Sequence, residues 1–334
     1  MGWKGTIRSA GAEANIAERD EKIRQNELKE QHEKYDAMSV LEQAAYDVDV
    51  YENYIDVIQS MHKECGAKIN WRSIQTSPKP EEPIKAREHE QKALLEVNNY
   101  KPNLIDRFLN RVEKKKAILL KVVEDAITLD QKAHEYQLPA WNREVETWQE
   151  NVDLAKALLN SEEKAKLETI EALQPFTEMS NLGSEFSVST KTNGLLEVTV
   201  KVNGAIIVPS KLKGLLKSGK LSVKKLPNTK FNEIYRDYVC SVALRVANEL
   251  FSILPDKLIV VTAVDGVLNT ETEALEDATI LSIAMSRKVM AKLKLKTLEP
   301  STAISDFVHN MSFKKTKGFE EVESIDVESL DLKA

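Results

Sequence analysis

The 334-residue chain has little of what cross-links a protein or interrupts its regular structure: two cysteines, 11 glycines and 10 prolines. These numbers exclude collagen-like and disulfide-rich chains, and Cys65 and Cys240 lie in unrelated contexts that build no cysteine-rich metal site. No stretch approaches the roughly 18 apolar residues of a membrane span. The N-terminus lacks the apolar core of a signal peptide. We therefore expect a cytoplasmic protein of long helices with short connections, without a membrane span.

The common enzyme motifs are also missing. There is no glycine-rich phosphate loop and no Gly-x-Ser-x-Gly elbow, and the five histidines are scattered without zinc spacing. The acid-x-Lys triplet of a restriction-endonuclease core is absent from the expected strands, where Glu197 and Lys201 stand four residues apart. We expect no cofactor and no metal, and keep an enzyme of unrecognised type, such as a degenerate nuclease, as an alternative.

Charge is distributed unevenly along the chain, whose formal net charge is −6. Residues 1–180 carry 26 basic and 34 acidic side chains, whereas residues 181–319 carry 20 basic and 13 acidic ones. Residues 320–334 hold six acids and one lysine, which predicts a flexible acidic C-terminal tail. A basic domain between acidic segments favours either a polyanionic partner or simple solubility.

The first half of the chain has the periodicity of helices. Residues 1–37 carry only a thin aliphatic stripe, so we expect an extended helix that self-associates as a coiled coil through Ile16, Ile23 and Leu28. Residues 38–178 predict an antiparallel helical hairpin or bundle, with one helix after Pro102 and another from Pro139. Positions 141–159 follow the heptad rhythm. This half is therefore expected to supply oligomerisation.

Residues 183–319 predict an α+β domain with an antiparallel meander. Asn193-Gly194 and Asn203-Gly204 favour type I′ turns between three strands, the last at 206–208. We expect a short helix at 212–216, a long one from Phe231 to Leu254, strands at 258–264 and 279–285, and a helix at 301–311. The fold class is thus multidomain, with a helical coiled-coil bundle followed by an α+β domain.

Two surfaces are candidate binding sites. Runs of basic residues without acidic ones predict a surface that binds nucleic acid. The alternative is a solvated lysine surface that keeps strand edges from pairing with other chains. The residues of the predicted surface are Lys211, Lys213, Lys217, Lys220, Lys224, Lys225, Arg287, Lys288, Lys292 and Lys294. The loop with Trp71, Pro78 and Pro80 is either an exposed tip that binds a partner or a cap on the hairpin core.

The composition and the missing motifs together favour a non-enzymatic, self-associating scaffold or adaptor subunit of a larger assembly. Its expected partners are a second copy of itself and other protein subunits. The alternative is a DNA- or RNA-binding protein that uses the lysine-rich domain.

Overall fold

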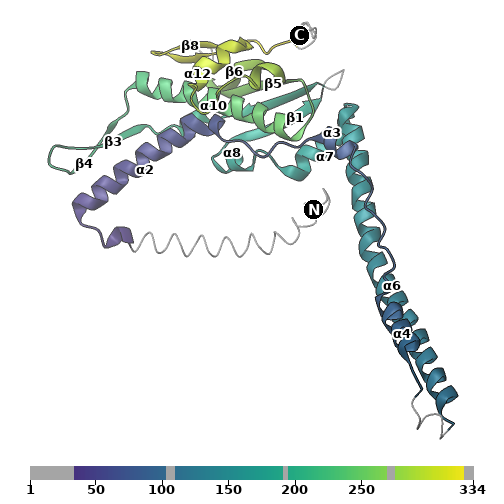
Figure 1. The fold of residues 1–334 in the computed structure, drawn as a ribbon. Coiled ribbons are helices and arrows are strands. Elements are labelled where there is room, and N and C mark those ends of the chain that lie inside the picture. The colour runs from purple at the N-terminus through teal and green to yellow at the C-terminus, as the bar shows by residue number, and fades with distance from the viewer. Residues whose placement is uncertain (1–33, 103–109, 191–194, 269–274, 327–334) are drawn as a thin grey trace. The chain divides into compact units, whose positions relative to one another are not determined.

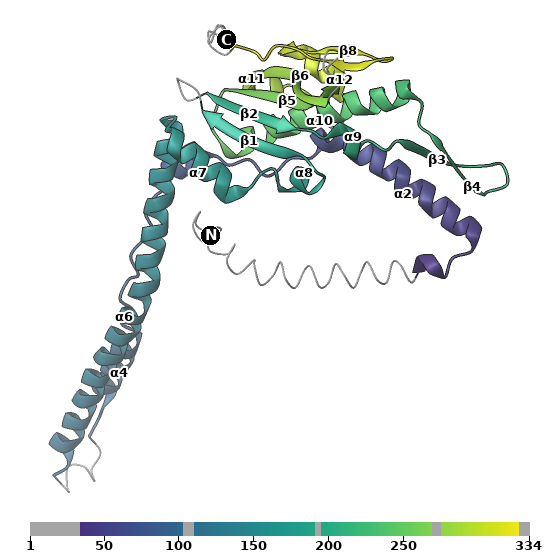
Figure 2. The same ribbon diagram turned by 180° about the vertical axis from the view of Figure 1, so that it is seen from behind.

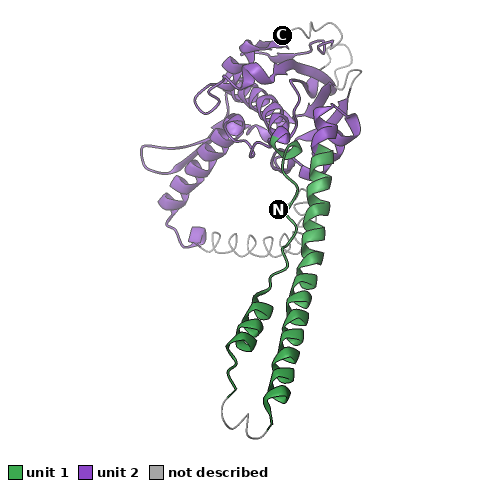
Figure 3. Cartoon of the chain, turned by 45° about the vertical axis from the view of Figure 1, so that its right-hand side comes forward, with its two compact units in different colours: residues 1–9, 73–154 green, residues 10–72, 155–334 purple. Residues whose placement is uncertain are grey.

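The computed structural model describes residues 34–102, 110–190, 195–268 and 275–326. The chain divides into a helical unit, residues 1–9 and 73–154, and an α+β unit, residues 10–72 and 155–334 (Figure 3). Within the described ranges, no helix is both long and apolar enough to cross a membrane. The units do not follow the expected division at residues 38 and 178, because the helix after Ser39 belongs to the α+β unit.

The helical unit is a hairpin in which α4 (Glu88–Asn99) lies against α6 (Val112–Leu159) (Figure 1). Ala93 packs between Val123 and Ala126. Arg87, the N-cap residue of α4, makes no side-chain cap. Instead the buried Asp130 of α6 accepts hydrogen bonds from the backbone N–H groups of His89 (3.3 Å) and Glu90 (2.9 Å). A carboxylate on one helix therefore fixes where the other begins.

Helix α6 is continuous through Pro139, so the expectation of two separate helices is wrong. A proline inside a helix removes one backbone hydrogen bond and costs about 3 kcal/mol. On the following turns, the indole N–H groups of Trp141 and Trp148 donate to the carbonyls of Pro80 (3.2 Å) and Ser77 (3.0 Å). These bonds fasten the extended segment before α4 along α6 and offset the loss.

The α+β unit contains a five-stranded sheet in the order β1-β2-β5-β6-β7 (Figures 1 and 2). Neighbouring strands are antiparallel except β2 and β5, which are parallel. The strands are β1 (Glu185–Thr190), β2 (Leu196–Lys201), β5 (Leu258–Leu268), β6 (Leu275–Ser286) and β7 (Val308–Asn310). The unit is thus a mixed α+β fold, as expected.

Helix α10 (Asn228–Ile253) connects the parallel strands and is the centre of this unit. From Asp237 to Ile253 every residue but Asn248 is buried. Around α10 lie α2 (Val40–Ser60), the 3-10 turn η1 (Met61–Lys63), α7 (Glu163–Leu173) and α12 (Pro300–Ala303). Ser39 begins α2 with a capping box closed by Glu42.

The smaller elements complete this unit. They are α3 (Trp71–Gln75), which continues into the helical unit, α8 (Thr177–Asn181), α9 (Gly204–Ile207), β3 (Lys211–Leu215), β4 (Leu221–Lys225), α11 (Arg287–Met290), η3 (Ile304–Asp306), β8 (Ser312–Lys314) and β9 (Gly318–Glu320).

Three local predictions in this region are wrong. Residues 204–207 are helix α9, not the start of a third meander strand, because the Gly204 N–H donates to the Asp265 carboxylate at 2.7 Å and turns the chain away from the sheet. Residues 211–215 form strand β3 of a separate two-stranded sheet with β4, not a helix. The expected helix at 301–311 ends within two turns and leads into β7.

The C-terminal segment is docked on the sheet as far as the structure describes it. Val322 N–H donates to the Thr279 carbonyl (2.9 Å), and Ile325 N–H donates to Ser282 Oγ (3.0 Å). The Ile325 side chain is 9% exposed and packs with Leu195, Val260 and Ala284. The expected flexible tail therefore does not begin at residue 320; residues 327–334 lie outside the described ranges.

We predict that Ile325→Ala lowers the free energy of unfolding by about 2–3 kcal/mol, because it removes a buried side chain from a packed cluster. Glu323→Ala is the matched control, since that side chain is exposed and only its backbone carbonyl is bonded. Urea denaturation measures both. Equal stability of the two variants would show that the segment is not docked.

Candidate functional site

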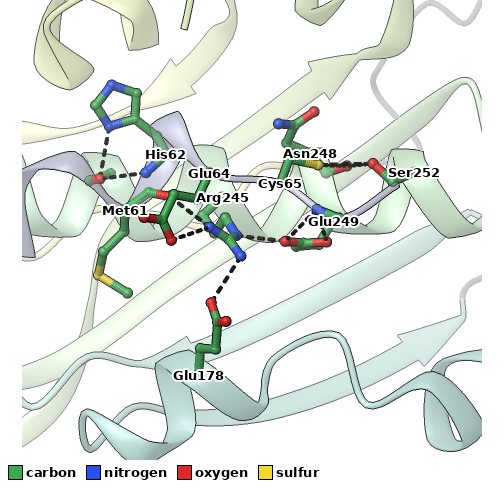
Figure 4. Close-up of polar contacts among 11 residues, drawn as sticks. Met61, His62, Glu64, Cys65, Glu178, Arg245, Asn248, Glu249 and Ser252 are labelled. Atoms are coloured by element: carbon green, nitrogen blue, oxygen red, sulfur yellow. Dashed lines mark hydrogen bonds and ion pairs between the residues drawn. The ribbon is translucent and has the colours of Figure 1, made fainter. Parts of the chain in front are cut away.

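Several polar side chains converge on Arg245 of α10, which is 8% exposed (Figure 4). Its guanidinium lies 2.6 Å from Glu249 Oε1, 3.1 Å from Glu178 Oε2 and 3.5 Å from Glu64 Oε2. It also donates to the Met61 carbonyl at 3.2 Å. Both Glu249 oxygens accept from the Gly66 N–H at 3.2 Å. One cation thus holds η1, the segment after it and α8 against α10.

These groups line an open depression of about 450 Å³ that also contains Cys65. The Cys65 thiol lies 2.9 Å from Ser252 Oγ. Burial raises the pKa of this thiol, and the hydrogen bond with Ser252 and the charge of Arg245 only partly oppose the shift. A thiol with a raised pKa is a poor nucleophile near neutral pH, and an arginine saturated by three carboxylates is a poor anion receptor. The arrangement therefore stabilises the fold.

His62 is also a structural residue. Its Nε2 lies 3.0 Å from the Leu298 carbonyl, which can only accept, so Nε2 carries the proton and Nδ1 accepts from the Ser241 hydroxyl at 2.9 Å. Burial lowers the pKa of the imidazole. In the described ranges, no three His, Cys, Asp or Glu side chains are grouped to hold a metal ion.

Asp265, at the end of a buried strand segment, accepts hydrogen bonds from the Gly204 N–H and the Tyr235 hydroxyl. Burial, followed by the charge of Asp265, raises the pKa of Tyr235. Lys201, which we compared with a nuclease lysine, pairs instead with Asp277 at 2.6 Å. Each of these groups therefore bonds to a partner within the chain.

Two of the candidate binding residues, Trp71 and Arg287, instead donate hydrogen bonds to the last carbonyls of α10. Trp71 is 3% exposed and donates its indole N–H to the Ile253 carbonyl at 2.7 Å, so the expectation of an exposed tryptophan tip is wrong. Arg287 donates to the carbonyls of Phe251 (2.6 Å) and Leu254 and stacks on Phe251. A helix leaves its last carbonyls without partners, and a cation there is favoured by the helix dipole. Arg287 therefore caps a helix and is not free to bind phosphate.

The other predicted positions remain on the surface or outside the described ranges. Pro78 is exposed and Pro80 half-buried along α6. Lys288, Lys292 and Lys294 are exposed near α11. The remaining six lysines lie on the β3–β4 hairpin and its turn. Ile16, Ile23 and Leu28 lie outside the described residues, so their role in self-association stays a prediction.

Sequence reasoning missed a row of exposed apolar side chains on α6. Ile118, Val122, Leu129 and Tyr136 are 56%, 42%, 54% and 87% exposed. Val122 and Leu129 share the helix with Ala126, but Ala126 packs against α4 whereas Val122 and Leu129 are exposed. In the sequence, two sets of apolar positions with helical spacing overlap along this one helix, and the second set corresponds to the exposed row.

Comparison with known proteins supplies no identity. No family model, no curated protein and no solved structure matches the chain.

We predict that Arg245→Ala lowers the free energy of unfolding by about 3–5 kcal/mol, because it leaves the buried Glu249 without its cation. Glu178→Ala is the control, since its side chain is 75% exposed and its pair with Arg245 is worth at most about 1 kcal/mol. Adding Glu249→Ala to Arg245→Ala is expected to restore part of the loss in denaturation experiments. If Arg245→Ala is as mild as the control, the charge cluster does not stabilise the unit.

Proposed function

We propose that the protein is a non-enzymatic assembly subunit that self-associates through its helical unit. The observation that carries this proposal is the apolar row Ile118, Val122, Leu129 and Tyr136, here called the α6 seam. Its members are separated by 4, 7 and 7 residues, so they lie within about 40° of one another around the helix. The row is about 27 Å long. Seams with this spacing are typical of helices that pair with other helices.

Two charged residues within the seam favour a second copy as the partner. Asp125 and Lys132 are exposed on the same stripe, on either side of Leu129, and neither has an ion pair among the described residues. In a parallel pair, each would meet its own equivalent, and like charges repel. In an antiparallel pair centred near Leu129, Asp125 of one copy approaches Lys132 of the other. Charge complementarity thus selects an antiparallel homodimer.

The rest of the chain is consistent with a structural role. In the α+β unit, the polar clusters around Arg245, His62 and Asp265 bond internally, so they tie segments together. The four seam residues, by contrast, are apolar and exposed, and they lie on the helical hairpin. Apolar surface in such a row is what burial against another chain stabilises, by about 25 cal/mol for each Å² covered.

We predict that Leu129→Glu converts a dimer into a monomer at micromolar concentration, because it places a charge at the centre of the seam. Leu120→Glu is the matched control. Leu120 is 55% exposed on the same helix, but it lies about 180° around the axis from Leu129. Sedimentation equilibrium measures the mass of each variant. A monomeric parent protein, or equal masses for both variants, would contradict the proposal.

Cysteine cross-linking tests the antiparallel geometry separately. In a Cys65→Ser background, a mixture of Asp125→Cys and Lys132→Cys chains is expected to form the mixed disulfide faster than either chain alone forms its own. Faster homodisulfide formation by Asp125→Cys would indicate a parallel pair.

A further inference from the structure

The β3–β4 hairpin carries a concentration of positive charge that its own chain, through the acidic helix α2 beside it, neutralises only in part. Residues 201–230 contain no acidic residue. Of the six lysines on the hairpin and its turn, only Lys213 has a described ion pair, with Asp47 at 3.5 Å. Lys211 and Lys225 are direct cross-strand partners. Like charges directly opposite destabilise a strand pair, and an isolated two-stranded hairpin is marginally stable in water.

Protecting a strand edge from pairing with other chains does not require two lysines opposite each other. Single lysines on an edge already prevent pairing with other chains. An opposed lysine pair adds repulsion across the hairpin itself, and a bound polyanion would remove that repulsion. The other lysines, at 217, 220 and 224, extend the same charge around the turn and along β4.

Gly214 gives an independent indication that another molecule approaches the hairpin. A glycine inside a strand costs about 0.5–1 kcal/mol relative to alanine. Gly214 does not have a positive φ, and a Cβ atom placed there would meet nothing within 4 Å. Neither backbone geometry nor packing within the chain therefore requires glycine. A strand glycine of this kind marks a place where a ligand can come close to the backbone.

The shape of the hairpin favours duplex DNA over duplex RNA as the polyanion that it binds. β3 and β4 form a separate two-stranded sheet that extends beside α2, away from the five-stranded sheet (Figures 1 and 2). The major groove of B-form DNA admits a two-stranded ribbon, whereas the major groove of an RNA duplex is too deep and narrow. Leu212, which is 41% exposed and lies on the same face as Gly214, supplies an apolar contact for a thymine methyl group.

From the lysines without ion pairs, the open glycine and the ribbon shape, we infer that the β3–β4 hairpin binds duplex DNA in the major groove. The face that carries Leu212, Gly214 and Lys224 lies against the DNA. The long side chains of Lys211 and Lys225 leave the opposite face at the base of the hairpin and reach phosphates on its two sides. No arginine lies on the hairpin to read guanine, so affinity comes from phosphate contacts and depends little on sequence. This inference does not require self-association.

The test measures binding of the full chain to a fluorescein-labelled 20-base-pair DNA duplex by anisotropy across a salt series. The double substitution Lys211→Gln/Lys225→Gln is expected to weaken binding about tenfold or more at 50 mM salt and to flatten the slope of log K against log salt by about 1.8. It should also raise the thermal midpoint, because it removes the opposed pair. The control, Lys288→Gln/Lys292→Gln, makes the same charge change at exposed positions away from the hairpin.

Gly214→Ala separates binding from folding. The added methyl group has space in the free protein, so the thermal midpoint should stay the same or rise, while affinity for the duplex should fall at least severalfold. A weaker complex with an RNA duplex of the same length is also expected. These effects are independent of the α6 seam and should persist in the Leu129→Glu variant, with any loss limited to avidity.

Three outcomes would overturn the inference. The first is no duplex binding at 50 mM salt. The second is an equal loss in the hairpin double variant and the control, which would show a diffuse electrostatic attraction. The third is tighter binding to phosphatidylglycerol vesicles than to DNA, lost in the hairpin variant, which would assign the lysines to a lipid surface.

Discussion

The α+β unit depends on one constraint: helix α10 is buried on nearly all sides, yet it carries polar and charged residues. A buried donor or acceptor without a partner costs about 1–3 kcal/mol, and a buried charge costs more. Arg245 is therefore matched to Glu249 and Glu178, and Ser241 to His62. The bonds to Glu178 and His62 draw segments distant in sequence onto the helix, so the requirement to satisfy α10 also determines what surrounds it.

The same requirement governs the end of the helix. The last carbonyls of α10 accept from the Ile69 N–H, the Trp71 indole and the Arg287 guanidinium. A tryptophan in a proline-rich segment and an arginine in a basic run have the composition of binding residues, and we predicted them as such. Composition does not distinguish a side chain that awaits a partner from one already bonded to its own chain. That distinction depends on which backbone carbonyls lack a hydrogen-bond donor in the folded chain, and the sequence does not show which carbonyls these are.

The long, strongly patterned elements were predictable. The expected helix at 231–254 matches α10 to within one residue at its C-terminal end, and the expected strands at 258–264 and 279–285 lie within β5 and β6. Long segments with a clear apolar pattern have few alternative structures. The structure of the short elements depends on groups that are distant in sequence. Asn203-Gly204 satisfies the rule for a hairpin turn, but Asp265, 61 residues later, captures the Gly204 amide. Ile325 has acidic neighbours in sequence and an apolar cluster in space, so its charged context misled the prediction of a free tail.

The α6 seam and the β3–β4 hairpin differ from the interior in that their interactions are incomplete. Around α10, Arg245 is paired with carboxylates and the last carbonyls of the helix have donors. On the hairpin, by contrast, two lysines oppose one another, and on α6 a row of apolar side chains faces solvent. Such features lower the stability of the isolated chain or leave it prone to association, and stability alone does not account for them. The seam lies in the helical unit and the hairpin in the α+β unit. One unit can therefore associate with a second copy while the other holds a polyanion, and neither interaction needs to alter the core around α10.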